Sequence, residues 1–204
     1  MKVVVTAGPT REYLDPVRFL SNPSTGKMGF AIAAEAARRG HEVTLIAGPV
    51  ALKTPARVHR VDVTSAREML AAVRAAVRRA DVLVSTAAVA DWRPAKCATK
   101  KLKKSQMSGV LKLVRNPDIL KTIRGVRKVG FAAETDHVLA EAVRKCREKG
   151  LSFVVANDVT QKGCGFGTDT NRVTFVFPDG TQRKFPLMTK RMVAKRILDA
   201  VSCL

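Results

Sequence analysis

Short, almost continuously apolar segments alternate with helix-like segments along most of this chain, and that alternation constrains its fold more than any other feature. Strands buried on both faces have this composition, and helices between them favour a parallel sheet. The expected strands are Val3–Thr6, Glu42–Ala47, Val61–Val63, Asp81–Thr86, Lys128–Ala132 and Ser152–Ala156. The expected helices are Lys27–Arg39, Ser65–Arg79, Asp118–Arg124 and His137–Lys149. Because crossovers between parallel strands are right-handed, the sequence predicts a doubly wound, mostly parallel, Rossmann-like α/β fold.

The C-terminal part departs from this alternation. The turn sequence Pro178-Asp179-Gly180 separates two extended segments, so a β-hairpin is expected at 171–187 as an extension of the sheet. A final helix over Thr189–Ser202 carries its apolar residues on one stripe. Since a chain of 204 residues suits one compact unit, we expect a single domain over 1–204.

The net charge is +20, from 37 lysines and arginines against 17 aspartates and glutamates. Such a surface attracts polyanions, so a nucleic-acid-binding module is one hypothesis. Many of the basic residues, however, lie where helices are expected to end, and cations there complement the helix dipole and stay solvated. The charge also suits nucleotides and phosphate esters, so it does not select a partner. The lysine-rich segment 93–109 lacks periodicity and is expected to be a mobile basic flap.

The four cysteines are scattered and form no C-x-x-C pair, which favours reduced thiols over a zinc site. No apolar run reaches the roughly 20 residues that a membrane span needs. The N-terminus becomes polar too early for a signal peptide. We therefore expect a cytoplasmic protein that does not associate with membranes.

A ligand is expected at the carboxyl ends of the strands, where the loops of an open α/β sheet converge. The loop after the first strand is long and ends in Ser24-Thr25-Gly26-Lys27 at the start of a helix. Unpaired amides at a helix N-terminus favour an anion, although a capped helix with a solvated Lys27 fits the same residues. The spacing matches neither a P-loop nor the G-x-G-x-x-G fingerprint.

Three further segments are expected near the same edge of the sheet. In Ala87–Pro94, small residues let a ligand approach the backbone, and Asp91 can bind a hydroxyl or a magnesium ion, or simply cap a turn. Lys145 and Lys149 are one helical turn apart, so they can reach one phosphate chain or end a solvated helix. The pair Asn116-Pro117 has the pattern of an N-cap and a first helical residue.

A series of motifs in fixed order resembles the phosphopantothenoylcysteine synthetase family, also called phosphopantothenate–cysteine ligase. The motifs are Thr6–Glu12, Leu14–Gly29, Ala87–Pro94, Lys101–Lys104, Asn116–Leu120, Gly130–Thr135 and Ala156–Asp158. Several motifs in order are more specific than any single fingerprint. In many members this domain follows a flavin-dependent decarboxylase, whose residues this sequence lacks, so the resemblance implies that the chain binds no FMN.

The resemblance implies a ligase of coenzyme A biosynthesis. The carboxylate of 4′-phosphopantothenate would attack the α-phosphate of CTP, giving an acyl-cytidylate and pyrophosphate, and L-cysteine would then displace CMP. The nucleotide is expected to be CTP rather than ATP and to come with Mg²⁺. A homodimer formed through the 171–187 hairpin is also expected, and a phosphopantothenoylcysteine decarboxylase is a candidate partner.

The resemblance also assigns roles to individual residues. Asn22 and Lys101 are the expected catalytic residues: the amide would orient the acyl phosphate, and the lysine would offset charge on the triphosphate. Arg18, Gly26 and Lys27 would bind the substrate or acyl phosphate together with Asn22. Asp91 would meet the ribose or the metal. The expected nucleotide-binding residues are Ser85, Thr86, Ala87, Ala88, Asp91, Lys101, Pro117, Asp118, Ile119, Leu120, Phe131, Lys145 and Lys149.

Other classes of function stay open. A nicotinamide- or flavin-dependent oxidoreductase would share the fold class, but the missing G-x-G-x-x-G argues against it. A nucleic-acid-binding module rests on the charge of +20 alone and predicts steeply salt-dependent binding. A non-enzymatic relative of the ligases is disfavoured because Asn22 and Lys101 are both present.

Overall fold

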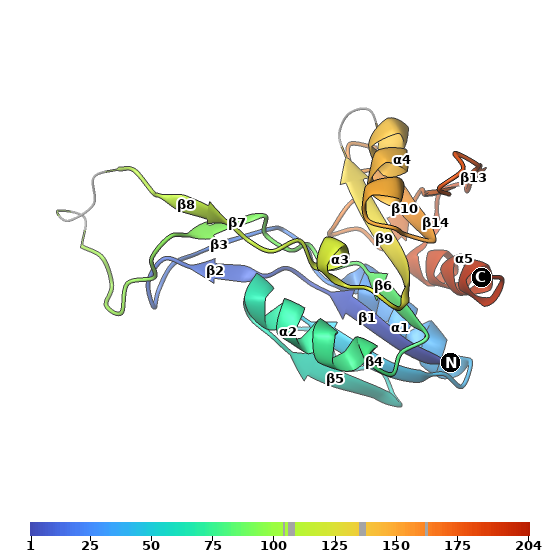
Figure 1. The fold of residues 1–204 in the computed structure, drawn as a ribbon, viewed down its shortest axis with the longest axis horizontal. Coiled ribbons are helices and arrows are strands. Elements are labelled where there is room, and N and C mark those ends of the chain that lie inside the picture. The colour runs from blue at the N-terminus through green and yellow to red at the C-terminus, as the bar shows by residue number, and fades with distance from the viewer. Residues whose placement is uncertain (104, 106–108, 135–137, 162) are drawn as a thin grey trace.

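The structure is a computed structural model that describes residues 1–103, 105, 109–134, 138–161 and 163–204. An eight-stranded sheet forms its centre (Figure 1). The strands are β1 (Lys2–Ala7), β4 (Glu42–Ala47), β5 (Val58–Asp62), β6 (Val82–Ser85), β9 (Arg127–Glu134), β10 (Phe153–Asp158), β12 (Thr174–Val176) and β13 (Gln182–Lys184). They lie in the order β13-β12-β10-β9-β6-β1-β4-β5.

The strands from β5 to β10 in this order are parallel. Numbered along the chain, these strands have the order 3-2-1-4-5-6, which is that of a doubly wound, Rossmann-like sheet. β12 and β13 continue the sheet beyond β10 as an antiparallel hairpin. The predicted fold class is therefore confirmed, including the hairpin extension.

Alternate residues of the central strands pack against different helices. The helices are α1 (Lys27–Arg38), α2 (Ala66–Val77), α3 (Ile119–Thr122), α4 (Val138–Glu148) and α5 (Lys190–Ser202). Val3, Val5 and Ala7 of β1 share a buried cluster with α1 and α5, whereas Val4 packs with α2 and α3. α4 packs on β10 and β12. Helices therefore cover both faces of the sheet, as almost continuously apolar strands require.

Two short ribbons project from the sheet and form an arm, which comprises residues 11–21 and the described residues among 92–115 (Figure 1). The ribbons pair β2 (Arg11–Tyr13) with β3 (Phe19–Ser21), and β7 (Trp92–Pro94) with β8 (Leu113–Arg115). The sequence did not predict these strands, because three residues are too few to show a periodicity. The predicted flap 93–109 belongs to this arm, but its Lys104 and residues 106–108 lie outside the described residues.

The prediction that Asn116 caps the next helix is wrong. α3 is a single turn whose N-cap is Asp118, because the Asp118 carboxylate accepts from the Lys121 N–H at 3.0 Å. The Asn116 side chain is used elsewhere: its Nδ2 donates to the Ala90 carbonyl at 2.8 Å. Asn116 therefore ties the start of the helix to the loop after β6, which carries part of the site described below.

The predicted hairpin is shorter than 171–187. β12 and β13 pair over three residues each, and the residues around them form another ribbon, β11 (Thr170–Asn171) with β14 (Met188–Thr189). The predicted helix start at His137 lies outside the described residues. Within the described ranges, no helix is both long and apolar enough to cross a membrane.

Candidate functional site

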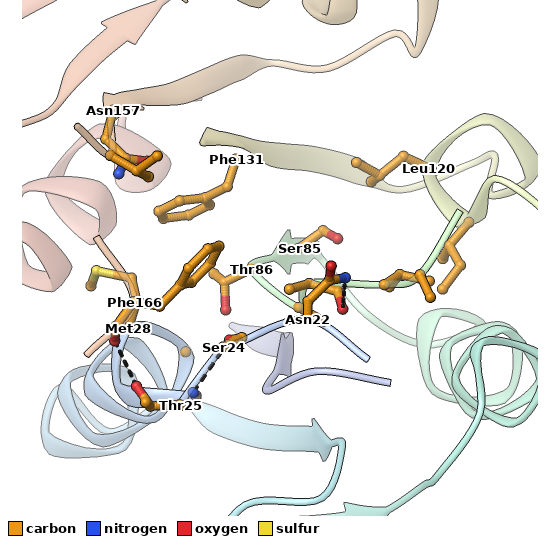
Figure 2. A pocket seen from close by; sticks show the side chains of 18 of the residues that line it. Asn22, Ser24, Thr25, Met28, Ser85, Thr86, Leu120, Phe131, Asn157 and Phe166 are labelled. Atoms are coloured by element: carbon orange, nitrogen blue, oxygen red, sulfur yellow. Dashed lines mark hydrogen bonds between the residues drawn. The ribbon is translucent and has the colours of Figure 1, made fainter. Parts of the chain in front are cut away.

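A cavity of about 380 Å³ lies at the carboxyl ends of the central strands (Figure 2). Its size is that of a small-molecule site. Ser85 at the end of β6, Phe131 in β9 and Asn157 in β10 contribute side chains from the sheet. Most predicted site residues line this cavity: Asn22, Gly26, Lys27, Ser85, Thr86, Ala87, Ala88, Asp91, Pro117, Asp118, Ile119, Leu120, Phe131, Lys145 and Lys149.

The loop after β6 is held by hydrogen bonds against the end of β1 and the loop that follows it. The Thr86 Oγ1 donates to the Thr6 carbonyl at 2.6 Å, and the Ala87 N–H donates to the Thr6 Oγ1 at 3.2 Å. The Ala88 N–H then donates to the Gly8 carbonyl at 2.9 Å. The backbone of the β6 loop is therefore fixed where a ligand would approach it.

The N-terminus of α1 opens onto the cavity. Its N-cap is Gly26, which has φ 77° and supplies no side-chain cap. At Gly29 an added Cβ would lie 2.5 Å from both the Ala7 Cβ and the Thr86 Oγ1, so only glycine allows the helix to pack this closely on β1 and β6. Unsatisfied N–H groups and the positive end of the helix dipole make this position suitable for an anion.

Lys27, the first residue of α1, was predicted to bind a phosphate, but in the structure its ammonium group contacts the segment after β10. Its Nζ lies 2.7 Å from the Asp169 Oδ1 and donates to the Gly167 carbonyl at 3.0 Å. The pKa of Asp169 is held below its ordinary value chiefly by this hydrogen bond from Lys27. The arrangement attaches the segment after β10 to the start of α1.

Asn22 reaches the cavity from the loop between β3 and α1, and its side chain points toward the β6 loop (Figure 2). Its Nδ2 donates to the Ala88 carbonyl at 3.1 Å. The preceding residue is anchored as well, because the Ser21 Oγ donates to the Thr10 carbonyl at 2.8 Å. These contacts fix the plane of the Asn22 amide beside the backbone of Ala88.

Asp118 and Lys149 form an ion pair on another wall of the cavity, with the Lys149 Nζ 3.0 Å from the Asp118 Oδ2. Burial alone would raise the pKa of Asp118, but the Lys121 N–H and the Lys149 ammonium hold it below its ordinary value. A charged Asp118 both caps α3 and places Lys149. Lys145 lines the same wall one helical turn earlier.

Arg18 and Lys101 do not line this cavity, although the sequence predicted both at the site. They lie on the arm. The Arg18 Nη2 lies 2.6 Å from the buried Asp15 Oδ2 and also donates to the Leu102 carbonyl at 2.9 Å. The Leu102 N–H donates to the same Asp15 oxygen at 3.2 Å, so the pair holds the segment next to Lys101. The predicted roles of Arg18 and Lys101 stay predictions.

The sequence missed a wall formed by the segment after β10. Phe166 and Asn171 line the cavity there, together with Lys190 from the start of α5. Figure 2 shows the Phe166 ring pointing into the cavity, on the same side as Phe131 and away from Leu120. The sequence signal for this wall is the glycine-rich run 163–167, which shows no helical or strand periodicity.

This chain is similar over its whole length to one family of known proteins. The family model described as DNA/pantothenate metabolism flavoprotein C-terminal domain matches residues 1–204. The coenzyme A biosynthesis bifunctional protein CoaBC of Escherichia coli (strain K12) is 46% identical over 209 residues, which cover 98% of this chain and 51% of that protein. The protein of the same name in Bacillus subtilis (strain 168) is 45% identical over 207 residues, which cover 99% of this chain and 51% of that protein.

A solved structure shows the same similarity in three dimensions. A crystal structure of the C-terminal domain of a coenzyme A biosynthesis bifunctional protein CoaBC has a TM-score of 0.83 and 43% identity, covering 98% of this chain and 93% of that one. Unlike this solved domain, the curated bifunctional relatives are about twice as long as the part that matches, so the chain spans about half the length of the curated relatives that it matches.

Proposed function

Since this chain belongs to the family of the DNA/pantothenate metabolism flavoprotein C-terminal domain, we propose that it is a phosphopantothenate–cysteine ligase of coenzyme A biosynthesis. In the proposed reaction, 4′-phosphopantothenate is activated by a nucleoside triphosphate and then coupled to L-cysteine. The names of the curated relatives and the similarity to a solved C-terminal domain support this proposal.

The proposal is supported most by the phosphate-binding groups that line one cavity. The open N-terminus of α1, the anchored amide of Asn22, and Lys145 and Lys149 all line it. Activating a carboxylate with a nucleotide requires groups that bind phosphates and offset their charge more than it requires a protein nucleophile. The amides of the α1 N-terminus and the two lysine ammonium groups can bind the phosphates and offset their charge. No protein nucleophile is needed, because in this reaction one substrate attacks the other.

We place the nucleotide against the wall that includes Asp118, Leu120 and Lys149, with the acyl phosphate near Asn22. The phosphate of 4′-phosphopantothenate is then assigned to the side of the cavity that includes the α1 N-terminus. CTP rather than ATP is the proposed nucleotide, as the motifs imply. This arrangement lets the carboxylate and the α-phosphate meet beside the Ala88 backbone.

Mg²⁺ is the metal that the proposed nucleotide would bring. Within the described residues, no three His, Cys, Asp or Glu side chains gather into a metal site. Mg²⁺ usually keeps several waters and binds one or two carboxylates together with substrate phosphates. Asp91, which is exposed and lines the cavity, fits as the single protein carboxylate for such an ion. The ion would neutralise phosphate charge.

We propose that the chain forms a homodimer through the arm. Large apolar side chains are exposed there: Val17, Phe19, Trp92, Val110, Leu111 and Leu113. The predicted interface at the hairpin instead exposes Gln182, Arg183 and Lys184 on the edge strand β13. Exposed apolar patches mark contact surfaces, so the arm is the better candidate.

A phosphopantothenoylcysteine decarboxylase is the proposed protein partner. The curated relatives are named bifunctional, and this chain matches about half of each. The product of the proposed ligase would be the substrate of such a decarboxylase. We therefore expect the ligase activity to co-purify with a phosphopantothenoylcysteine decarboxylase.

The test of the ligase is the appearance of its coupled product. The purified chain is incubated with 4′-phosphopantothenate, Mg²⁺, CTP and ¹³C-labelled cysteine, and the mixture is followed by mass spectrometry. Phosphopantothenoylcysteine that carries the label is the expected result. Absence of any labelled product with CTP and with ATP contradicts the proposed function.

A further inference from the structure

Lys128 and Lys190 are buried lysines to which the proposed reaction gives no role. They are 4% and 6% exposed, respectively. Removing an ammonium group from water is costly unless its N–H groups find acceptors. Burial lowers the pKa of both side chains, which reflects this cost. A lysine retained in such a position needs a structural or functional reason.

Lys128 extends from β9 to the ends of two helices. Its Nζ donates to the Leu120 carbonyl at 2.9 Å and to the Ile123 carbonyl at 3.1 Å. Its third acceptor is the carbonyl of Lys149, the residue after α4. Carbonyls at helix C-termini lack intrahelical partners and carry partial negative charge. One ammonium group therefore joins the ends of α3 and α4.

These helix ends form one wall of the cavity. Leu120 and Lys149 line it directly, and Asp118 joins the two helices a second time through its ion pair with Lys149. The position of this wall therefore depends on an ammonium group that lies behind it. In the proposed reaction, this is the wall assigned to the nucleotide.

Lys190 occupies a position that a cation should avoid. It is the first residue of α5, directly after the N-cap Thr189, where the helix dipole is positive. Its Nζ donates to the carbonyls of Gly165 at 2.9 Å, Phe166 at 3.3 Å and Thr168 at 2.6 Å. These three carbonyls, all in the segment after β10, therefore offset the repulsion between the Lys190 ammonium group and the positive end of the α5 dipole.

The same segment is also held by Lys27 at the start of α1 and by Thr25 just before it. The Thr25 Oγ1 donates to the Phe166 carbonyl at 2.7 Å, and the Lys27 Nζ donates to the Gly167 carbonyl at 3.0 Å. Together with Lys190, these side chains bind every carbonyl from residue 165 to residue 168. With the backbone fixed in this way, the Phe166 side chain is directed into the cavity (Figure 2).

We propose that Lys128 and Lys190 are positioning residues that set opposite walls of the cavity independently, Lys128 for the nucleotide and Lys190 for the pantothenate-derived substrate. The assignment of substrates to walls rests on the proposed function. The division into separately supported walls rests on the hydrogen bonds alone. Each lysine acts through the backbone that it binds and touches no reacting atom.

The first experiment measures each substrate's KM in Lys128→Met and Lys190→Met, by phosphopantothenate-dependent pyrophosphate release. Methionine keeps the length of the side chain and removes the ammonium group. We expect Lys128→Met to raise the KM for CTP about tenfold and leave that for 4′-phosphopantothenate within about twofold, and Lys190→Met to do the reverse. Lys195→Met, exposed on the same helix as Lys190, should change neither KM.

The second experiment is independent of the reaction. Hydrogen exchange of the free protein should accelerate at residues 119–123 in Lys128→Met, and at 165–169 in Lys190→Met, with the other segment unchanged. Where a methionine variant does not fold, the arginine variant replaces it, since a guanidinium keeps the charge but not the three-carbonyl geometry. The arginine variants should show the same selective acceleration of hydrogen exchange, but to a smaller extent.

The outcomes separate the two proposals. Selective exchange in a protein that forms no product supports the division of the walls and overturns the ligase. Equal rises in both KM values, or exchange that accelerates in both segments of each variant, show that the lysines contribute only to overall stability. Either of those results overturns the positioning roles even where the ligase is active.

Discussion

Asn22 is the single residue on which the proposed coupling step depends most, because its amide is fixed beside the backbone of Ala88 in the cavity. The motif around it predicted a position at the site, and the structure places its amide in the cavity, anchored to the Ala88 carbonyl. Phe166 and Lys190 were not predicted, because nothing local distinguishes an aromatic in a glycine-rich run from a core residue, or a lysine at a helix start from a solvated one. Their positions depend on contacts far away in sequence.

Replacing Asn22 tests its proposed part in the second half of the reaction. Asn22→Asp loses the N–H that binds the Ala88 carbonyl and places a negative charge beside the acyl phosphate. We expect pyrophosphate release to continue while coupling to cysteine slows at least about 100-fold. Rapid-quench analysis of both products measures the split. Gln182→Glu, the same amide-to-carboxylate change on the exposed edge strand β13, should couple at the normal rate. Full coupling by Asn22→Asp would remove Asn22 from the mechanism.

Glu35 gives a prediction about pH. It is 5% exposed, and its carboxylate accepts from the Arg38 Nε at 2.7 Å and the Arg39 Nε at 2.9 Å. Arg38 first, and then Arg39, lower the pKa of Glu35 from 4.5 to about 2 against the opposing effect of burial. A pKa lowered by folding means that the carboxylate stabilises the fold above pH 4.5, and that this contribution is lost as the pH falls toward 2.

The measurement is denaturant unfolding of Glu35→Gln against the unsubstituted chain between pH 7 and pH 2.5. At pH 7 the variant should be less stable by about 1 kcal/mol, a modest value because Arg38 is largely exposed to solvent. The difference should shrink as the pH falls below 4.5. Glu42→Gln, whose partner Lys2 is also exposed, is the control. A difference that does not change with pH would show that Glu35 contributes through packing alone.

At the scale of elements, the strand and helix patterns predicted the central sheet better than they predicted the arm ribbons, the short helix α3 and the packing of α1 on the sheet. Glu42–Ala47 was predicted with its observed bounds because six apolar-rich residues between a glycine cap and a loop are unambiguous. The arm ribbons and the single turn of α3 are too short for periodicity and are stabilised by long-range contacts. The close packing of α1 on β1 was likewise invisible in the sequence, though it sets the shape of the cavity.

Gly29 tests that packing. In Gly29→Ala the new Cβ would meet the Ala7 Cβ and the Thr86 Oγ1 at 2.5 Å, so α1 must move away from the sheet. We expect a loss of about 1 to 3 kcal/mol in the free energy of unfolding, together with weaker binding of both substrates. Ala34→Gly, exposed on the same helix, should cost about 1 kcal/mol and leave substrate binding unchanged. Unchanged binding in Gly29→Ala would mean that α1 need not sit this close to the sheet.

At the scale of the whole molecule, the charge of +20 and the exposed apolar arm point to different partners. The charge was visible in the sequence but does not identify a ligand. The arm was invisible, because the sequence cannot show which apolar residues a fold leaves uncovered. The structure therefore moves the proposed dimer surface from the hairpin to the arm.

Sedimentation of two charge variants tests this surface. Val17→Asp with Leu113→Asp puts carboxylates into the exposed apolar patch of the arm, which should convert a dimer into a monomer at micromolar concentration. Arg183→Asp, on the edge strand β13, should stay dimeric. The opposite pattern would return the interface to the hairpin, and a single species of 22.1 kDa for the unsubstituted chain would contradict any dimer.

In the proposed reaction, this cavity activates the carboxylate of 4′-phosphopantothenate with a nucleotide. The most direct measurement is pyrophosphate release from the purified chain with Mg²⁺ and either CTP or ATP, with and without 4′-phosphopantothenate and with and without cysteine. We expect pyrophosphate release with CTP that requires 4′-phosphopantothenate, proceeds for about one turnover without cysteine and becomes continuous when cysteine is present. No 4′-phosphopantothenate-dependent release with either nucleotide would contradict the proposed function and favour a binding protein, for which salt-dependent association with RNA is the next measurement.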